Sequence, residues 1–129
     1  EKILEKMPQK KLDTLLSIPI VNNIIRGAIK KKLGLAKAKI CASGAAPASV
    51  PLLQWWKKLG VEIYQIYGMT EDCVYAHFNS QHGNKFGTVG RPLPGLQVKL
   101  APENNEIRVK SNCMMRGYYK LPDLSAEMF

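Results

Sequence analysis

The sequence lacks any long apolar run. Its most apolar stretch, residues 18–25, contains two asparagines and is followed by Arg26, whereas a helix needs about 20 apolar residues to cross a bilayer. The chain opens on Glu1 and has no basic stretch followed by an apolar run, as a signal peptide would. We therefore expect neither a membrane span nor a secreted protein, and we expect a piece cut from a longer chain.

Cysteine is scarce as well. Cys41, Cys73 and Cys113 are far apart, and no two of them have C-x-x-C spacing, which argues against a disulfide framework or a structural zinc site. Cys73, His77 and His82 are metal-ligating residue types in one short segment, but they lack a fourth ligand. His77 is better interpreted as a histidine at a pocket edge or at the surface. The cysteine usage fits a reducing, cytoplasmic location.

Aromatic residues make up 8% of the 129 residues, and none lies in the basic part of the chain. The formal net charge is +9, and residues 1–39 hold ten Lys or Arg against three acidic residues, so most of the charge is local. Without aromatic residues to stack on bases, this pattern argues against a nucleic-acid partner. A basic helical module that binds an anionic membrane surface or a protein partner stays as the alternative function.

With 46% hydrophobic and 22% charged residues, the composition is that of a globular domain. Residues 1–16 have a loose helical pattern, which Pro8 interrupts. A second helix is predicted to begin at Pro19 and to stop at Gly34. Its apolar stripe consists of Ile20, Val21, Ile24, Ile25, Ala28 and Ile29.

A strand is predicted over residues 39–42, a helix over 48–59 and a second strand over 61–66. The helix should turn Leu52, Leu53, Trp56 and Leu59 inward, with Lys57 and Lys58 facing out. The pair Trp55 and Trp56 is interpreted as core and partly exposed contact, not as part of a cofactor site. Strand, helix and strand at this spacing form a βαβ unit, whose strands are parallel neighbours. The loops Ser43–Pro47 and Tyr67–Glu71 should then open on the same sheet edge, where α/β proteins bind ligands.

Glycine and proline become frequent after residue 83 and predict a loop over residues 83–95. Gly87-Thr88-Val89-Gly90 lies in it and is no dinucleotide fingerprint, because it follows no strand and opens no helix. Arg91 could support a site loop or form an ion pair. Residues 97–100 and 106–110 predict a hairpin, and residues 123–129 a helix start. The fold class is α/β: a βαβ parallel-sheet unit preceded by helices and followed by a short antiparallel hairpin region.

The run Tyr67-Gly68-Met69-Thr70-Glu71 carries the most chemistry. An aromatic face can stack on a base, Gly68 lets the backbone approach a ligand, Thr70 can donate to a phosphate oxygen, and Glu71 can hold Mg²⁺. The competing interpretation is structural: Thr70 would cap a helix whose first turn carries Glu71 and Asp72.

Several motifs in order give the sequence a resemblance to a known family. They are Ser43-Gly44-Ala45-Ala46-Pro47, Tyr67-Gly68-Met69-Thr70-Glu71, Gly87-Thr88-Val89-Gly90-Arg91-Pro92, Glu106-Ile107-Arg108-Val109-Lys110 and Met115-Arg116-Gly117-Tyr118-Tyr119-Lys120. With them, the chain resembles the AMP-forming acyl-CoA synthetases of the adenylate-forming superfamily, specifically the long-chain fatty acid–CoA ligases. The resemblance covers nearly the whole chain.

The resemblance implies a role for each matching residue. Tyr67 would pack on adenine, with the backbone of Gly44, Ala45 and Ala46 on the other side. Thr70 would contact the AMP phosphate and Glu71 would be the magnesium ligand, which makes these two the catalytic pair. Gly68 and Met69 would lie beside the acyl carboxylate.

The resemblance also implies the substrates ATP, CoA and a long-chain fatty acid, with medium-chain or aryl acids as alternatives. Residues 1–95 would be the C-terminal part of an α/β adenylation subdomain, and residues 96–129 the start of a β-rich one. The family's phosphate loop, ribose-binding aspartate and catalytic lysine are not among the 129 residues. We therefore expect the chain alone to be inactive, to self-associate through its apolar stripe, and to touch membrane surfaces through residues 1–39.

Overall fold

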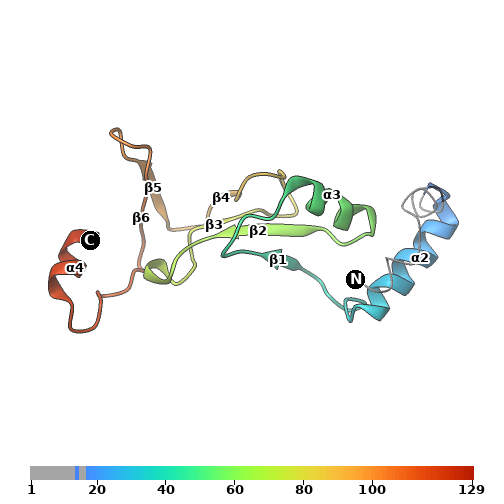
Figure 1. Ribbon diagram of the computed structural model, residues 1–129, viewed down its shortest axis with the longest axis horizontal. Helices are drawn as coiled ribbons and strands as arrows, with labels where there is room; N and C mark the ends of the chain where they lie inside the picture. Colours follow the sequence, from blue (N-terminus) through green and yellow to red (C-terminus); the bar gives the residue numbers. More distant parts are fainter. Residues whose placement is uncertain (1–13, 15–16) are drawn as a thin grey trace. The chain divides into compact units, whose positions relative to one another are not determined.

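The computed structural model describes residue 14 and residues 17–129, so the helix predicted over residues 1–16 lies outside the described residues. The chain divides into two compact units, one of residues 1–41 and 51–63 and the other of residues 42–50 and 64–129. Figure 1 shows the elements in chain order. They are α2 (Pro19–Lys32), β1 (Cys41–Ser43), α3 (Val50–Lys58), β2 (Ile63–Tyr67), η1 (Thr70–Asp72), β3 (His77–Phe78), β4 (Arg91–Pro92), β5 (Gln97–Leu100), β6 (Ile107–Lys110) and α4 (Pro122–Met128).

Helix α2 begins at Pro19, as predicted, with Ile18 as its N-cap. At its other end, Gly34 has a φ of 75° and its N–H donates to the carbonyl of Lys31 at 3.2 Å. The N–H of Leu35 donates to the carbonyl of Lys30 at 2.7 Å. This pair of bonds closes the helix end in a Schellman motif, which requires a left-handed residue at Gly34.

The apolar stripe of α2 is only partly covered. No residue of this helix is buried, and Ile20 and Ile24 are 76% and 69% exposed. Val21, Ile25 and Ile29 are half-buried. The helical period was therefore predicted correctly, whereas half of the stripe remains in contact with solvent.

Helix α3 ends by the same device, with Gly60 at a φ of 78°. Leu53 and Leu59 are buried, but Leu52 is 47% exposed, so the prediction of its burial was wrong. Adjacent helical residues point about 100° apart, so Leu52 and Leu53 do not share a face. Trp55 and Trp56 are half-buried and meet edge to face, with ring centroids 5.2 Å apart.

The same unit joins α2 to the end of α3. The guanidinium of Arg26 donates from Nε to the carbonyl of Lys58 at 2.9 Å. A Cβ on Gly60 would lie 2.9 Å from Cδ of Arg26. Glycine therefore serves two purposes at position 60, since it adopts the left-handed backbone and leaves room for the arginine.

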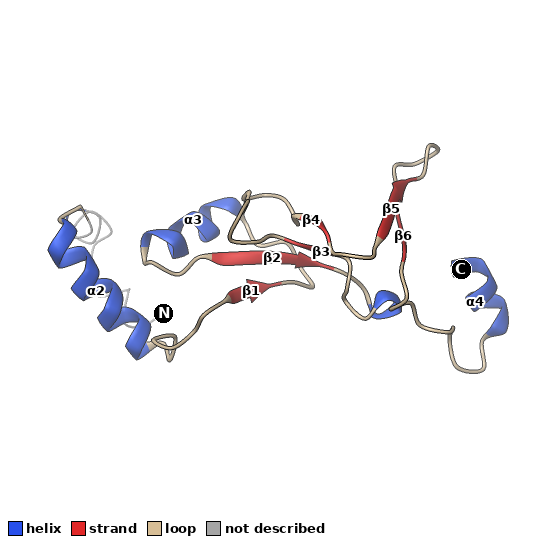
Figure 2. Ribbon diagram, turned by 180° about the vertical axis from the view of Figure 1, so that it is seen from behind, coloured by secondary structure: helices blue, strands red, loops and turns tan. Residues whose placement is uncertain are grey.

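The four-stranded sheet has the order β1-β2-β3-β4 and includes a parallel pair. Strands β1 and β2 lie next to each other in this sheet, as predicted for the two strands of the βαβ unit. Figure 2 shows the four strands from behind. Strand β1 begins at Cys41 and β2 at Ile63, each two residues later than predicted. Val61 instead belongs to the end of α3, where its N–H donates to the carbonyl of Trp56 at 3.0 Å.

Strands β3 and β4 correct the sequence analysis, which had no strand at 77–78 and a loop over 83–95. Strand β3 pairs antiparallel with β2 and with β4, and it places His77 opposite Tyr67 and Pro92. Each strand has two residues, too few to show an alternating pattern. Arg91 is exposed in β4 and forms no ion pair with the residues that the structure describes.

The hairpin of β5 and β6 agrees with its prediction and forms a separate two-stranded sheet. Gln97 pairs with Lys110 and Leu100 with Ile107. Helix α4 likewise occupies the predicted C-terminal segment. All three cysteines are free. Among the described helices, none combines the length and apolar character that crossing a bilayer demands.

Candidate functional site

The loop after β1 lies against the end of β2. A Cβ on Gly44 would be 3.2 Å from the carbonyl oxygen of Ile66, so the two backbones are in near contact. Ala45 has a left-handed φ of 67°, and residues 44–47 are exposed. The structure thus brings the Ser43–Pro47 loop next to the strand that leads into Tyr67, as the βαβ prediction required.

The ring of Tyr67 meets His77 edge to face, with ring centroids 5.7 Å apart. His77 is 7% exposed. The expectation of a surface histidine was therefore wrong, and the ring of Tyr67, its partner residue in β2, packs against this side chain. Burial lowers the pKa of His77, although the carboxylate of Asp72 acts in the opposite direction.

Gly68 is required by the fold itself. A Cβ at this position would lie 2.6 Å from both Cα and the carbonyl carbon of Val74. The chain turns back here through two left-handed residues, Cys73 (φ 56°) and Val74 (φ 60°). The sequence analysis predicted that Gly68 lets a ligand approach the backbone. The structure shows instead that the returning backbone at Val74 occupies the space of a side chain at this position.

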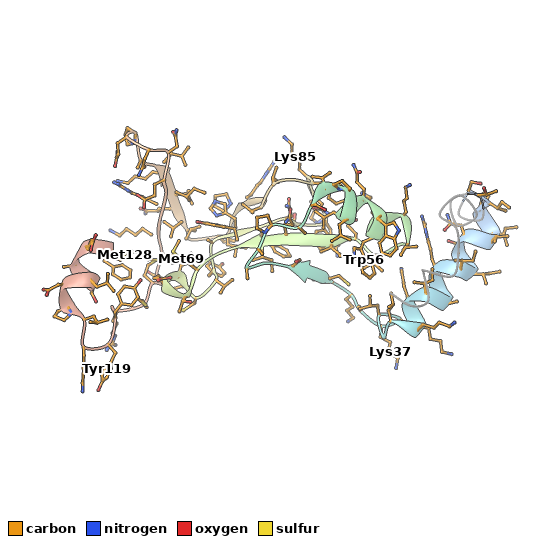
Figure 3. All side chains as sticks on the ribbon, in the orientation of Figure 1. Lys37, Trp56, Met69, Lys85, Tyr119 and Met128 are labelled. Atoms are coloured by element: carbon orange, nitrogen blue, oxygen red, sulfur yellow. The ribbon has the colours of Figure 1, made fainter. Side chains whose placement is uncertain are left out.

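Asp72 holds the start of η1. Its Oδ1 accepts a hydrogen bond from the N–H of Met69 at 2.9 Å, and the residue is fully buried. Thr70 follows the N-cap residue Met69 and is exposed. The structural alternative, in which Thr70 caps a helix, is therefore wrong, because Asp72 supplies the side-chain bond. Figure 3 labels Met69 at this point of the chain.

Glu71 is held from a segment far along the chain. The hydroxyl of Tyr118 donates to Oε1 of Glu71 at 2.5 Å, and the N–H of Met115 donates to the Glu71 carbonyl at 2.8 Å. The hydrogen bond from Tyr118 lowers the pKa of Glu71, and the same bond raises the pKa of Tyr118. The carboxylate is therefore charged at neutral pH.

Sequence reasoning missed the site role of Tyr118, Asp72 and Asn79. Asn79 is 1% exposed, accepts from the N–H of Lys85 at 3.3 Å and donates to the Thr88 carbonyl at 2.5 Å. It thereby fixes the glycine-rich loop beside β3. Tyr118 lies in the motif at residues 115–120, but the sequence analysis assigned no site role to that motif.

The edge thus combines a half-buried aromatic ring, an exposed hydroxyl and a charged carboxylate, from Tyr67, Thr70 and Glu71. A lone carboxylate suits Mg²⁺, which usually takes one or two carboxylates together with phosphate oxygens. In the described part of the chain, no three His, Cys, Asp or Glu side chains form a metal-binding group. Cys73, His77 and His82 are therefore not brought together into such a group.

Comparison with known proteins identifies the family. A family model described as "AMP-binding enzyme" matches residues 3–119. Long chain acyl-CoA synthetase 5 of Arabidopsis thaliana is 30% identical over 126 residues, which cover 86% of this chain and 19% of that protein. Malonate–CoA ligase of the same plant is 35% identical over 101 residues, with 72% and 16% covered.

A solved structure shares the fold. It is the O-succinylbenzoate coenzyme A synthetase of Bacillus subtilis in complex with ATP and magnesium ion, at a TM-score of 0.61 and 26% identity. The likeness covers 72% of this chain and 23% of that protein, so the chain spans less than a quarter of each of these three relatives. The match over residues 3–119 shows that the chain belongs to the AMP-binding enzyme family, the adenylate-forming acyl-CoA synthetases.

Proposed function

We propose that the protein containing this chain is an ATP-dependent long-chain fatty acid–CoA ligase. A carboxylate oxygen attacks the α-phosphorus of ATP, pyrophosphate leaves, and acyl-AMP forms. The thiolate of CoA then attacks the acyl carbon, and AMP leaves. The observation that carries this proposal is the convergence of Tyr67, Thr70 and the charged Glu71 at one sheet edge beside the exposed Gly44 loop.

The proposed roles follow from the chemistry of each group. Tyr67 stacks on adenine, and the exposed backbone of Gly44, Ala45 and Ala46 borders the other face of the base. The hydroxyl of Thr70 donates to the α-phosphate. Gly68 and Met69 lie beside the acyl carboxylate.

Glu71 is proposed as the magnesium ligand, since its carboxylate is charged and half-exposed. When bound, Mg²⁺ neutralises charge that develops on the phosphate oxygens. Glu71 and Thr70 themselves orient the α-phosphate for the incoming carboxylate.

Relatives named for malonate and for long-chain acids both match this chain. The preference for a long-chain acid therefore rests on the resemblance at the sequence level. The full reading frame that contains the 129 residues should be expressed and assayed for ATP–pyrophosphate exchange with palmitate, octanoate, benzoate and malonate. We expect the fastest exchange with palmitate. A faster reaction with another acid would reassign the substrate, and no exchange with any of them would overturn the proposal.

We further propose that residues 1–95 belong to the α/β adenylation subdomain and that residues 96–129 begin a β-rich one. The separate two-stranded sheet from Gln97 to Lys110 supports this division. The 129 residues alone should bind ATP with a dissociation constant of about 1 mM or weaker, because one stack and two polar contacts scarcely exceed the cost of association. The 129 residues alone should not catalyse the formation of acyl-CoA.

A second proposal concerns location. The exposed Ile20 and Ile24 of α2, together with Lys30, Lys31 and Lys32 in its last turn, have the composition of a helix that binds an anionic membrane surface. We propose a cytoplasmic protein whose residues 1–39 contact such a surface.

A further inference from the structure

Glu71 is fixed at two points by one short segment. The N–H of Met115 donates to the backbone carbonyl of Glu71 at 2.8 Å, and the hydroxyl of Tyr118 donates to its carboxylate at 2.5 Å. Tyr118 is 47 positions away in the sequence, so this contact belongs to the fold and not to the local motif. A glutamate side chain with no such partner samples several rotamers.

Tyr118 is itself held in place. Its N–H donates to Oγ of Ser125 at 2.8 Å, and that hydroxyl donates to the carbonyl of Leu121 at 2.8 Å. A Cβ on the preceding Gly117 would lie 2.8 Å from the same Oγ. The first turn of α4 therefore fixes the backbone from which the tyrosine reaches Glu71.

We propose that Tyr118 is a positioning residue, whose hydroxyl fixes the Glu71 carboxylate in the orientation that receives the metal–nucleotide complex. The inference rests on the proposed function, in which Glu71 is the magnesium ligand. Partners that orient a metal ligand in this way contribute strongly to metal affinity, because the ligand is ordered before the metal arrives.

The neighbouring residue provides a matched control. Tyr119 is 86% exposed, and its recorded contact is the ammonium of Lys120 at 5.3 Å from the ring centroid. Figure 3 labels it on the loop before α4. Tyr118→Phe and Tyr119→Phe each remove one phenolic hydroxyl, at adjacent positions. Only Tyr118→Phe also removes a hydrogen bond to Glu71.

The test measures nucleotide binding by the full-length protein without turnover. The probe is α,β-methylene-ATP, titrated by calorimetry with Mg²⁺ and with EDTA, and the readout is the ratio of the two dissociation constants. Tyr118→Phe should reduce the gain from Mg²⁺ by about 10-fold, while the affinity in EDTA stays the same. Tyr119→Phe should change neither value. An unchanged ratio in Tyr118→Phe would overturn the inference.

Two further variants separate this inference from the proposed function. Glu71→Gln should remove most of the gain from Mg²⁺; if it does not, the proposed function of Glu71 fails. If Glu71→Gln removes the gain and Tyr118→Phe does not, only the positioning role fails.

Should Tyr118→Phe unfold, Ser125→Ala loosens Tyr118 without removing its hydroxyl. It should reduce the gain several-fold, and an unchanged gain would count against the inference. In exchange assays, Tyr118→Phe should raise the Mg²⁺ concentration needed for half-maximal rate and approach the parent rate at saturation.

Discussion

Two regions of this chain differ in which groups they bury: residues 67–72 bury a polar side chain, and helix α2 exposes apolar ones. Within residues 67–72, Asp72 is buried and bonded to a backbone N–H, and the Glu71 carboxylate accepts a hydrogen bond from Tyr118. Helix α2 buries none of its residues and leaves two isoleucines in solvent. Since a buried polar atom without a hydrogen bond has a free-energy cost and Oδ2 of Asp72 has no partner among the described residues, the first region has an arrangement that stability alone would not favour. The first region thus encloses polar groups, and the second leaves apolar groups in contact with solvent.

Replacing Glu71 gives the largest effect that this contrast predicts. Glu71→Ala in the full-length protein should slow adenylate formation by about 100-fold or more, because the variant loses the carboxylate that is proposed to hold the metal against the transferred phosphate. ATP–pyrophosphate exchange measures this rate. Glu127→Ala, an exposed glutamate of α4, is the control and should exchange normally. Equal rates in the two variants would remove Glu71 from the mechanism.

Substitutions of Asp72 test whether its buried side chain stabilises the fold. Asp72→Ala should lower the free energy of unfolding by about 1–3 kcal/mol, because it strands the N–H of Met69 without its acceptor. Asp72→Asn keeps an acceptor for that N–H and replaces Oδ2, which has no partner among the described residues. The second variant should therefore be less destabilised in denaturant titrations. The reverse order would show that the loop needs the second carboxyl oxygen of Asp72.

His77 sharpens the same comparison through pH. Its pKa lies below 6.5 in the folded protein, so between that lowered pKa and about pH 6.5 the unfolded chain binds a proton that the folded one does not. The free energy of unfolding should fall as the pH decreases from 7 towards 5.5. His77→Gln should flatten this part of the curve. His82→Gln, at an exposed position, should leave the slope as it is; an equal flattening by both would contradict the burial argument.

The other side of the contrast predicts the smallest effect on stability. Replacing Ile20 and Ile24 by serine should change the free energy of unfolding by less than about 0.5 kcal/mol, because both side chains are already exposed. The same double variant should reduce self-association in sedimentation velocity and reduce binding to vesicles that contain anionic lipid. Val21→Ser with Ile25→Ser, on the half-buried side, should cost more stability. Unchanged association would show that this stripe is not the contact surface.

The sequence pattern predicted the elements that are defined locally. Gly34 and Gly60 end their helices, and the hairpin from Gln97 to Lys110 pairs as its alternation indicated. Strands β3 and β4 escaped prediction because pairing, not periodicity, defines a two-residue strand. Asp72 was named only as an acid in the first turn of a helix, since nothing local indicates that tertiary contacts bury it.

The site shows the same division between local and distant information. Tyr67, Thr70 and Glu71 stand in one pentapeptide, so a motif could find them and the βαβ pattern could place the Gly44 loop beside them. The bond from Tyr118 joins residues 47 positions apart. No spacing rule relates two such residues, and only the fold brings them together.

That separation also matters while the chain is being made. At about 5–20 residues per second, roughly 2 to 10 s pass between synthesis of Glu71 and synthesis of Tyr118. During this interval a nascent chain already carries the complete Tyr67–Glu71 motif, but its carboxylate has no tyrosine to accept from. A translation product that stops before residue 118 would thus retain the family's recognisable signature and lack the bond that orders it.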